Sequence, residues 1–117
     1  MSTRAAIGYY TIAGAGEIKT IYCHYDGYPR HVGKILKEHY STDKAVDELV
    51  RGCAIRNFDH DGTICRFPDG GVEFSDDMQD AIEGLDYLYL WDFDASKWSC
   101  YARDGFVNPD ILTEIEL

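Results

Sequence analysis

A strict alternation of aromatic and aliphatic residues constrains the fold of this chain more than any other feature. The run from Leu85 to Phe93 repeats with a period of two, the spacing that sends successive side chains to opposite faces of a β-strand. Asp94-Ala95-Ser96 interrupts the pattern, and Lys97 to Arg103 resumes it. We therefore predict a β-hairpin. Its aromatic stripe consists of Tyr87, Tyr89, Trp91 and Phe93, together with Trp98.

A second β-hairpin is predicted near the start of the chain. Thr3 to Thr11 is rich in Ala, Ile and Tyr, and Glu17 to Tyr25 is a run of β-branched and aromatic residues. Between them lies Ala13-Gly14-Ala15-Gly16, whose glycines favour a turn. Neither face of the second run is purely polar, so we expect it to be a central strand.

Two helices are predicted after this hairpin. Pro29 suits the first turn of a helix, and apolar residues recur at helical spacing from Arg30 to about Tyr40. Ser41 or Thr42 caps a second helix, which Gly52 ends. The apolar stripe of the second helix consists of Ala45, Val46, Leu49 and Val50.

The remaining segments carry weaker signals. Between Cys53 and Gly71 we expect turns with a short strand at about Thr63 to Phe67, and from Ser75 to Glu83 a short acidic helix. The type of the terminal segment that starts at Asn108 stays open. Together these elements predict an α+β fold, an antiparallel β-sheet built from two hairpins with two or three short helices packed on one face. We expect a single domain, residues 1–117.

The chain also predicts a cellular compartment. No apolar run approaches the ~20 residues that a membrane span needs, and the start of the chain lacks the apolar region of a secretory signal. The 4 cysteines include no C-x-x-C pair, as is typical of buried thiols in a reducing compartment. We expect a cytoplasmic protein, located in the host cell cytoplasm if the chain is viral.

The formal net charge of -10 is distributed unevenly. Met1 to Phe58 contains 8 Lys/Arg and 6 Asp/Glu, whereas Asp59 to Leu117 contains 3 Lys/Arg and 15 Asp/Glu. Such a second half repels nucleic acid, because affinity for a phosphate backbone comes from Lys and Arg that displace counterions. A basic protein surface is the natural complement of this half. The carboxylates expected to bind the partner are Asp59, Asp61, Glu73, Asp76, Asp77, Asp80 and Glu83.

The stretch IYCHYDGYP, from Ile21 to Pro29, resembles a group of small, mostly uncharacterised proteins of bacteriophages and prophages. The start MSTR and the residues Val32-Gly33-Lys34 and His39-Tyr40 are similar to the same group. The resemblance implies a viral or prophage source and no particular chemistry. By size and charge the chain is also similar to anti-CRISPR proteins and DNA-mimicking anti-restriction proteins. This similarity is an analogy between classes of protein and assigns no role to any residue.

Charge and resemblance together predict a phage-encoded inhibitor of a host defence system, such as an anti-CRISPR protein, and not an enzyme. Its acidic face would bind a basic nucleic-acid-binding surface of a host protein, without direct contact to nucleic acid and without a cofactor. The sequence leaves the oligomeric state open, with a homodimer as one alternative. A structural protein of the virion is a further alternative.

A small-ligand protein is the alternative of a different class. It would bind or sequester a nucleotide signal, or act on it as a small enzyme through His24 and Asp26, which share a face if the strand continues. The opposing interpretation is that Asp26 only caps a turn and His24 packs beside Tyr22. The aromatic hairpin has two interpretations as well, a stacking surface if the sheet face is open and core if helices cover it. The ligand residues of this alternative are His24, Asp26, Tyr28, His31 and Trp91.

Two other kinds of site are disfavoured by spacing. Cys23 and His24 are adjacent on a strand and point to opposite faces, which argues against a thiol nucleophile with its base. His31 and His39 lie about two helical turns or ~12 Å apart, too far to ligate one ion. The turn Asp59-His60-Asp61-Gly62 lacks the further spaced acidic ligands of a calcium loop. We expect no metal.

Overall fold

Both predicted hairpins are confirmed in the computed structural model, which describes residues 3–12, 15–103 and 112–117. The first hairpin pairs β1 (Ala5–Ile12) with β2 (Ala15–Cys23), although Ala13 and Gly14 of its predicted turn lie outside the described residues. The second pairs β6 (Tyr87–Asp92) with β7 (Lys97–Arg103), and Trp91 stands directly opposite Trp98. The two indole rings meet edge to face at 5.4 Å, an arrangement that aromatic rings favour.

The two predicted helices are present as well. A π-helical turn at Pro29–Gly33 leads directly into α1 (Lys34–His39), and α2 spans Asp43–Val50. Of the two predicted caps it is Thr42 that starts α2, because its hydroxyl accepts a hydrogen bond from Ala45 N at 3.2 Å. After α2, Gly52 has a φ of +130°, which only glycine adopts without strain.

The weakly signalled part of the chain contains more strands than the sequence predicted. The expected strand near Thr63 is β4, and the expected acidic helix is the shorter α3. The strands β3 and β5 were not predicted. The terminal segment, whose type was left open, contains the strand β8, and its start at Asn108 to Asp110 lies outside the described residues. These elements are β3 (Ile55–Phe58), β4 (Ile64–Arg66), β5 (Glu73–Ser75), α3 (Met78–Ile82) and β8 (Leu112–Ile115).

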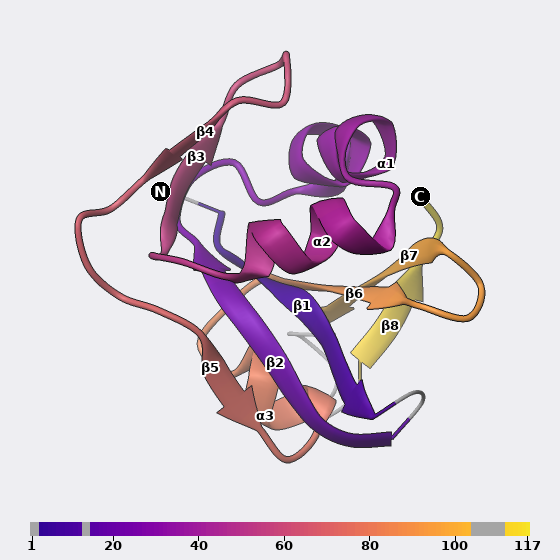
Figure 1. Cartoon of the computed structure of the whole chain (residues 1–117). Helices are drawn as coiled ribbons and strands as arrows, with labels where there is room; N and C mark the ends of the chain where they lie inside the picture. The colour runs from indigo at the N-terminus through magenta and orange to yellow at the C-terminus, as the bar shows by residue number, and fades with distance from the viewer. Residues whose placement is uncertain (1–2, 13–14, 104–111) are drawn as a thin grey trace.

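The predicted antiparallel sheet of two hairpins is wrong in two respects. The described strands form one eight-stranded sheet in the order β4-β3-β2-β1-β6-β7-β8, with β5 beside β2 (Figure 1). The sheet is also mixed, because β1 pairs with β6 in parallel and β2 pairs with β3 in parallel. The chain thus joins its two hairpins through their inner strands, a long-range pairing that no local pattern encodes.

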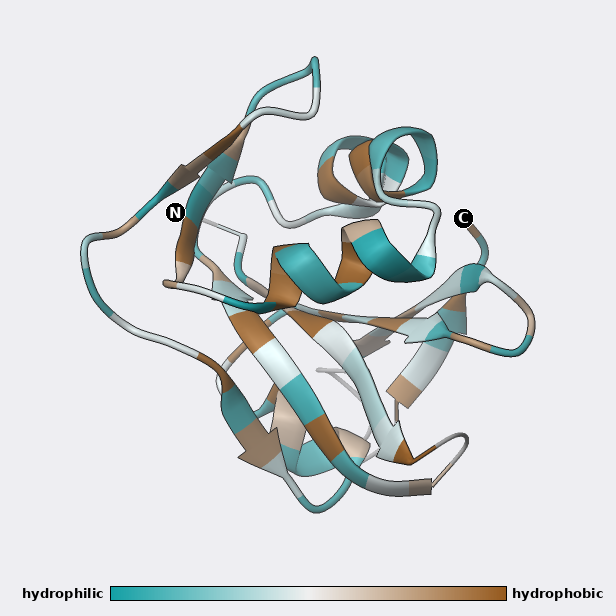
Figure 2. Cartoon of the chain, viewed as in Figure 1, coloured by the Kyte–Doolittle hydropathy of each residue, from teal (hydrophilic) through white to brown (hydrophobic). Residues whose placement is uncertain are grey.

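The prediction that the helices lie on one face is also wrong. α1 and α2 cover one face of the sheet, and α3 lies against the other (Figures 1 and 2). Side chains alternate between the two faces of the sheet, and each face forms an apolar core layer. Ile7 and Tyr89 face α1 and α2, while Leu88 and Leu90 face α3. A central sheet buried on both faces explains why β6 is apolar at nearly every position.

A tyrosine hydroxyl ties the turn after β2 to the middle of the sheet. Tyr89 is fully buried, and its hydroxyl donates a hydrogen bond to Gly27 O at 2.7 Å. Gly27 in turn donates from its N–H to Thr3 O at 2.9 Å, and a Cβ added to Gly27 would lie 2.9 Å from Ala5 Cβ. The turn at Gly27 therefore holds the start of the chain and the middle of the sheet together. In the described part of the chain, no helix has the length and apolar character to span a membrane.

We expect Gly8→Ala to destabilise the protein by about 3 kcal/mol or to prevent folding, because a core that is already full does not accept added atoms. A Cβ on Gly8 would lie 1.8 Å from Lys19 O of the neighbouring strand. Gly71→Ala is the matched control, since a Cβ there meets nothing within 4 Å. Urea unfolding of both variants measures the difference, and equal midpoints would contradict the close approach of β1 and β2.

Candidate functional site

His24 does not form the predicted pair with Asp26. Its Nδ1 is hydrogen-bonded to the Tyr22 hydroxyl at 2.6 Å, and its ring packs against Tyr25 and Phe67. Asp26 is exposed and has a φ of +55°, which is the turn geometry of the opposing interpretation. Histidine and carboxylate are thus not arranged as an acid and base in this structure.

Tyr28 and His31 lie on the other side of the same turn. Tyr28 is exposed and has no side-chain hydrogen bond among the described residues, whereas His31 packs beside His60 of the β3–β4 turn. His31 Nε2 lies 2.9 Å from Phe58 O, and since a carbonyl oxygen only accepts, the imidazole donates this bond. His31 therefore anchors the start of the first helix to β3.

Trp91 is core and not an open stacking surface. The α1 and α2 helices cover it, 3% of its surface is exposed, and its indole N–H donates to Asp43 Oδ1 at 2.9 Å. Trp98 is buried beside it and donates to Tyr40 O at 2.8 Å. The five residues of the small-ligand alternative are consequently not gathered around one cavity.

The acidic residues are divided between two regions. Asp59 and Asp61 belong to the β3–β4 turn, which projects at the top of Figure 1, while β5 and α3 lie at the bottom. Hydrogen bonding to the Thr63 side chain and, at 2.9 Å from Asp61 Oδ1, to Thr63 N lowers the pKa of Asp61 and gives it a structural role in the turn. The predicted single acidic face is thus a contiguous group from β5 to α3 plus a separate acidic turn.

We call the contiguous group the acidic edge. It consists of five exposed carboxylates, Glu73, Asp76, Asp77, Asp80 and Glu83. Two of them also build the start of α3: Asp77 accepts a hydrogen bond from Asp80 N at 2.8 Å, and Asp80 Oδ2 accepts from Asp76 N at 3.3 Å. These two hydrogen bonds hold the carboxylates of Asp77 and Asp80 at the start of the helix.

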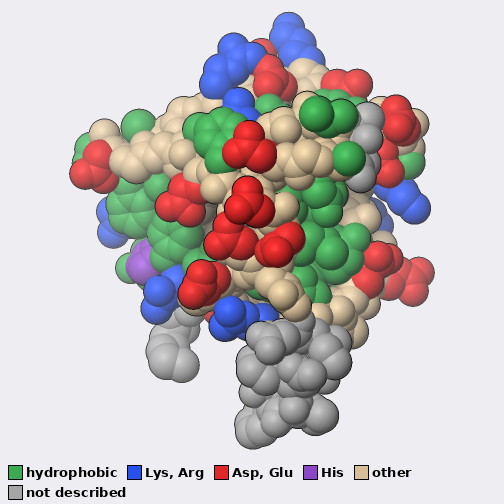
Figure 3. Space-filling view, turned by 90° about the horizontal axis from the view of Figure 1, so that it is seen from below, with side chains coloured by type: hydrophobic (Ala, Val, Ile, Leu, Met, Phe, Trp, Pro, Cys, Tyr) green, Lys and Arg blue, Asp and Glu red, His purple; other side chains and the backbone are tan. Residues whose placement is uncertain are grey.

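An exposed aromatic ring stands beside the acidic edge. Phe74 lies on β5 and is 55% exposed. Its neighbours Glu73 and Ser75 point to the opposite face of the strand, and Lys19 of β2 stands directly across from it. Figure 3 shows the side of the molecule that carries α3 and β5, with Asp and Glu side chains gathered in the middle and Lys and Arg toward the margins.

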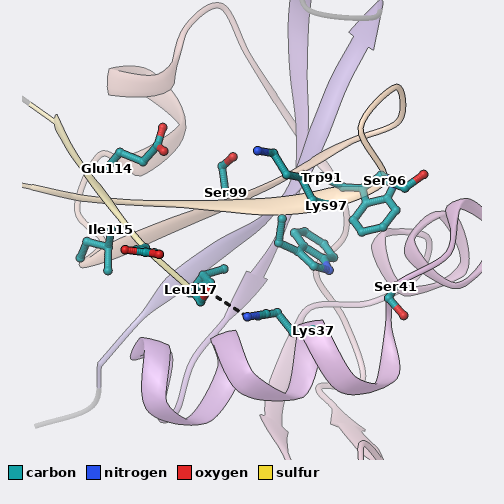
Figure 4. Close-up of a pocket in the computed structure, with 11 residues that line it drawn as sticks. Lys37, Ser41, Trp91, Ser96, Lys97, Ser99, Glu114, Ile115 and Leu117 are labelled. Atoms are coloured by element: carbon teal, nitrogen blue, oxygen red, sulfur yellow. Dashed lines mark hydrogen bonds between the residues drawn. The ribbon is translucent and has the colours of Figure 1, made fainter.

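A cavity of about 370 Å³ lies on the opposite side of the sheet, where the chain leaves β8 (Figure 4). β8 pairs with β7 only as far as Ile115 opposite Cys100, and the tail then turns toward α1, where Lys37 Nζ donates to Leu117 O at 2.8 Å. The wedge between this tail and the start of β7 is the cavity. Its polar lining comes from lysine, serine and glutamate residues, Lys37, Lys97, Ser41, Ser96, Ser99, Glu114 and Glu116.

Sequence reasoning did not find this cavity. Its walls come from α1, the turn before α2, β7 and the chain end, and only the paired indoles Trp91 and Trp98 carried a sequence signal. Phe74 was missed as well, because a three-residue strand has too short a pattern to show which side is covered.

Two buried cysteines and one arginine serve the fold. Burial raises the pKa of the Cys23 and Cys100 thiols to about 12 each, so both are protonated at neutral pH. Arg66 donates to Cys53 O and Leu49 O at the end of α2. Among the described residues, no three His, Cys, Asp or Glu side chains are grouped in a way that would hold a metal ion.

Comparisons with protein-family models, with curated proteins and with solved structures find no match to this chain.

Proposed function

We propose that the protein is an inhibitor that binds a basic nucleic-acid-binding surface of a host defence protein through its acidic edge. The observation that carries this proposal is the concentration of five exposed carboxylates between β5 and α3, next to an exposed Phe74. Clustered charge of one sign steers a partner of opposite charge and selects against partners of like charge.

The class of partner follows from the sign and the arrangement of the charge. Nucleic acid carries the same sign as the acidic edge and is repelled. Proteins that bind DNA or RNA carry grooves of Lys and Arg that match about one phosphate charge per ~1.7 Å of duplex axis, and a compact group of carboxylates competes for such a groove. The resemblance of Ile21 to Pro29 to phage proteins supports a defence factor as the partner that carries the groove.

A second candidate function is favoured by the cavity of Figure 4. A planar ligand with an anionic group, of the nucleoside monophosphate class, would place its ring against the apolar wall of Trp98 and Ile115 and its phosphate near Lys37 or Lys97. Cavities of this size commonly hold small molecules. The carboxylates of Glu114 and Glu116 also line the space, and they oppose an anion.

The first prediction of the inhibitor function is loss of binding on charge reversal. We expect Glu73→Lys, Asp76→Lys and Glu83→Lys together to weaken binding to a nucleic-acid-free CRISPR effector complex by about tenfold or more, because like charges then meet across the interface. These three positions are chosen because Asp77 and Asp80 accept the hydrogen bonds that start α3, and changing them would disturb the helix.

The matched control reverses three exposed carboxylates away from the acidic edge, Glu38, Glu48 and Asp94, so that both variants have the same net charge. Surface plasmon resonance at two salt concentrations measures the affinities. Equal loss in both variants would show that only the net charge matters, and unchanged binding in the first variant would exclude the acidic edge as the binding surface.

The second candidate has a separate readout, because the 2 tryptophans of the chain both line the cavity. If a nucleotide binds there, adenosine monophosphate shifts the two indole N–H signals in an ¹H–¹⁵N spectrum, and Lys37→Gln reduces the shift whereas Lys44→Gln, on α2, does not. Unchanged indole signals at millimolar nucleotide would exclude the cavity as a nucleotide site.

A further inference from the structure

β5 has an open edge. The strand pairs with β2 through Ile18 opposite Ser75 and Thr20 opposite Glu73, and among the described strands nothing pairs with its outer side. In Figure 1, β5 forms the outer margin of the sheet at this place. The backbone beside it is accessible as well, since a Cβ added to Gly71 meets nothing within 4 Å. A strand edge with free N–H and C=O groups is a template for another strand.

The two faces of this edge differ in chemistry. Phe74 projects on one face and is 55% exposed, while Glu73 projects on the other. Asp76 and the start of α3 extend the negative charge beyond the end of the strand. Proteins commonly protect an edge strand by making it short and charged. The shortness and Glu73 fit such protection, but a half-exposed phenylalanine does not.

We propose that β5 is a strand-addition site, which captures an extended basic segment of the partner as a further strand of the sheet. This inference rests on the proposed function and specifies how the acidic edge recognises its partner. Side chains of the added strand alternate between the faces, so the segment carries apolar residues toward Phe74 and Lys or Arg toward Glu73. Main-chain hydrogen bonds supply affinity in this mode, and the alternation supplies specificity.

Charge complementarity argues against a second copy of this chain as the occupant. Two β5 strands paired edge to edge would bring together two acidic edges that each carry five carboxylates. Like charges directly opposite each other across strands are destabilising. A basic segment meets no such penalty.

The test uses three synthetic peptides with the full-length protein. The first peptide alternates lysine and valine, the second has the same composition with the residues in pairs, and the third is the alternating peptide with methylated backbone nitrogens. Isothermal titration calorimetry compares affinities, and backbone amide shifts of Val72 to Ser75 report the place of binding. We expect the alternating peptide to bind about tenfold more tightly than either of the others, a difference that a few main-chain hydrogen bonds supply.

Phe74→Ala is expected to weaken the alternating peptide about tenfold or less, through loss of one partly buried aromatic contact. Ile12→Ala is the matched control, because Ile12 is also an exposed apolar side chain, 65% exposed, at the far end of β1. An effect of Ile12→Ala equal to that of Phe74→Ala would count against the site.

The outcomes separate this inference from the proposed function. Equal affinity of all three peptides would mean that charge alone attracts them, which overturns strand addition and leaves an acidic binding surface in place. Absence of binding by any peptide also overturns it, while the charge-reversal experiment with the effector complex judges the inhibitor function independently. A dimer in sedimentation that Phe74→Ala dissociates would overturn it by identifying a second copy as the occupant.

Discussion

The parallel pairing of β1 with β6 is the constraint on which the rest of this structure depends. It places Ile7 beside Tyr89 and Ala5 beside Tyr87, and so joins two hairpins that lie far apart in the chain into one sheet. The buried Tyr89 hydroxyl then ties the turn at Gly27 to the middle of this sheet. The hydrogen bond also satisfies a polar group that lies in an apolar layer. Burial raises the pKa of Tyr89, so the hydroxyl stays neutral and keeps its proton for this bond.

This arrangement separates the structural and the charged parts of the molecule. The motif from Tyr22 to His31 is used internally: His24 bonds Tyr22, Gly27 bonds Thr3 and Tyr89, and His31 bonds Phe58. The acidic edge, by contrast, is built on β5 and α3, a short strand and a short helix at the margin of the sheet. Of these carboxylates, Asp77 and Asp80 also hold the start of α3 through hydrogen bonds.

The sequence predicted the elements whose signals are local. Alternation revealed β6 and β7, helical spacing and a threonine cap revealed α1 and α2, and a Gly-rich turn revealed the first hairpin. Strands of three or four residues are too short to show a period, so β3 and β5 were not predicted and β4 was expected only from its place between turn signals. The helices were assigned to one face because the order of the strands is set by long-range pairing, which no local pattern encodes. The same limit applies to the site. Asp59 and Asp61 carry the same charge as Glu73 and precede it by few residues, but the β3–β4 turn lies at the top of Figure 1 and β5 at the bottom.

Hydrogen–deuterium exchange of the chain, free and bound to a nucleic-acid-free CRISPR effector complex, tests the central claim most directly. The claim is that the acidic edge meets the partner while the segment from Tyr22 to His31 maintains the fold. The account predicts that binding slows exchange from Val72 to Glu83 and leaves the segment from Tyr22 to His31 unchanged. Protection confined to Tyr22 to His31, with none from Val72 to Glu83, would contradict it.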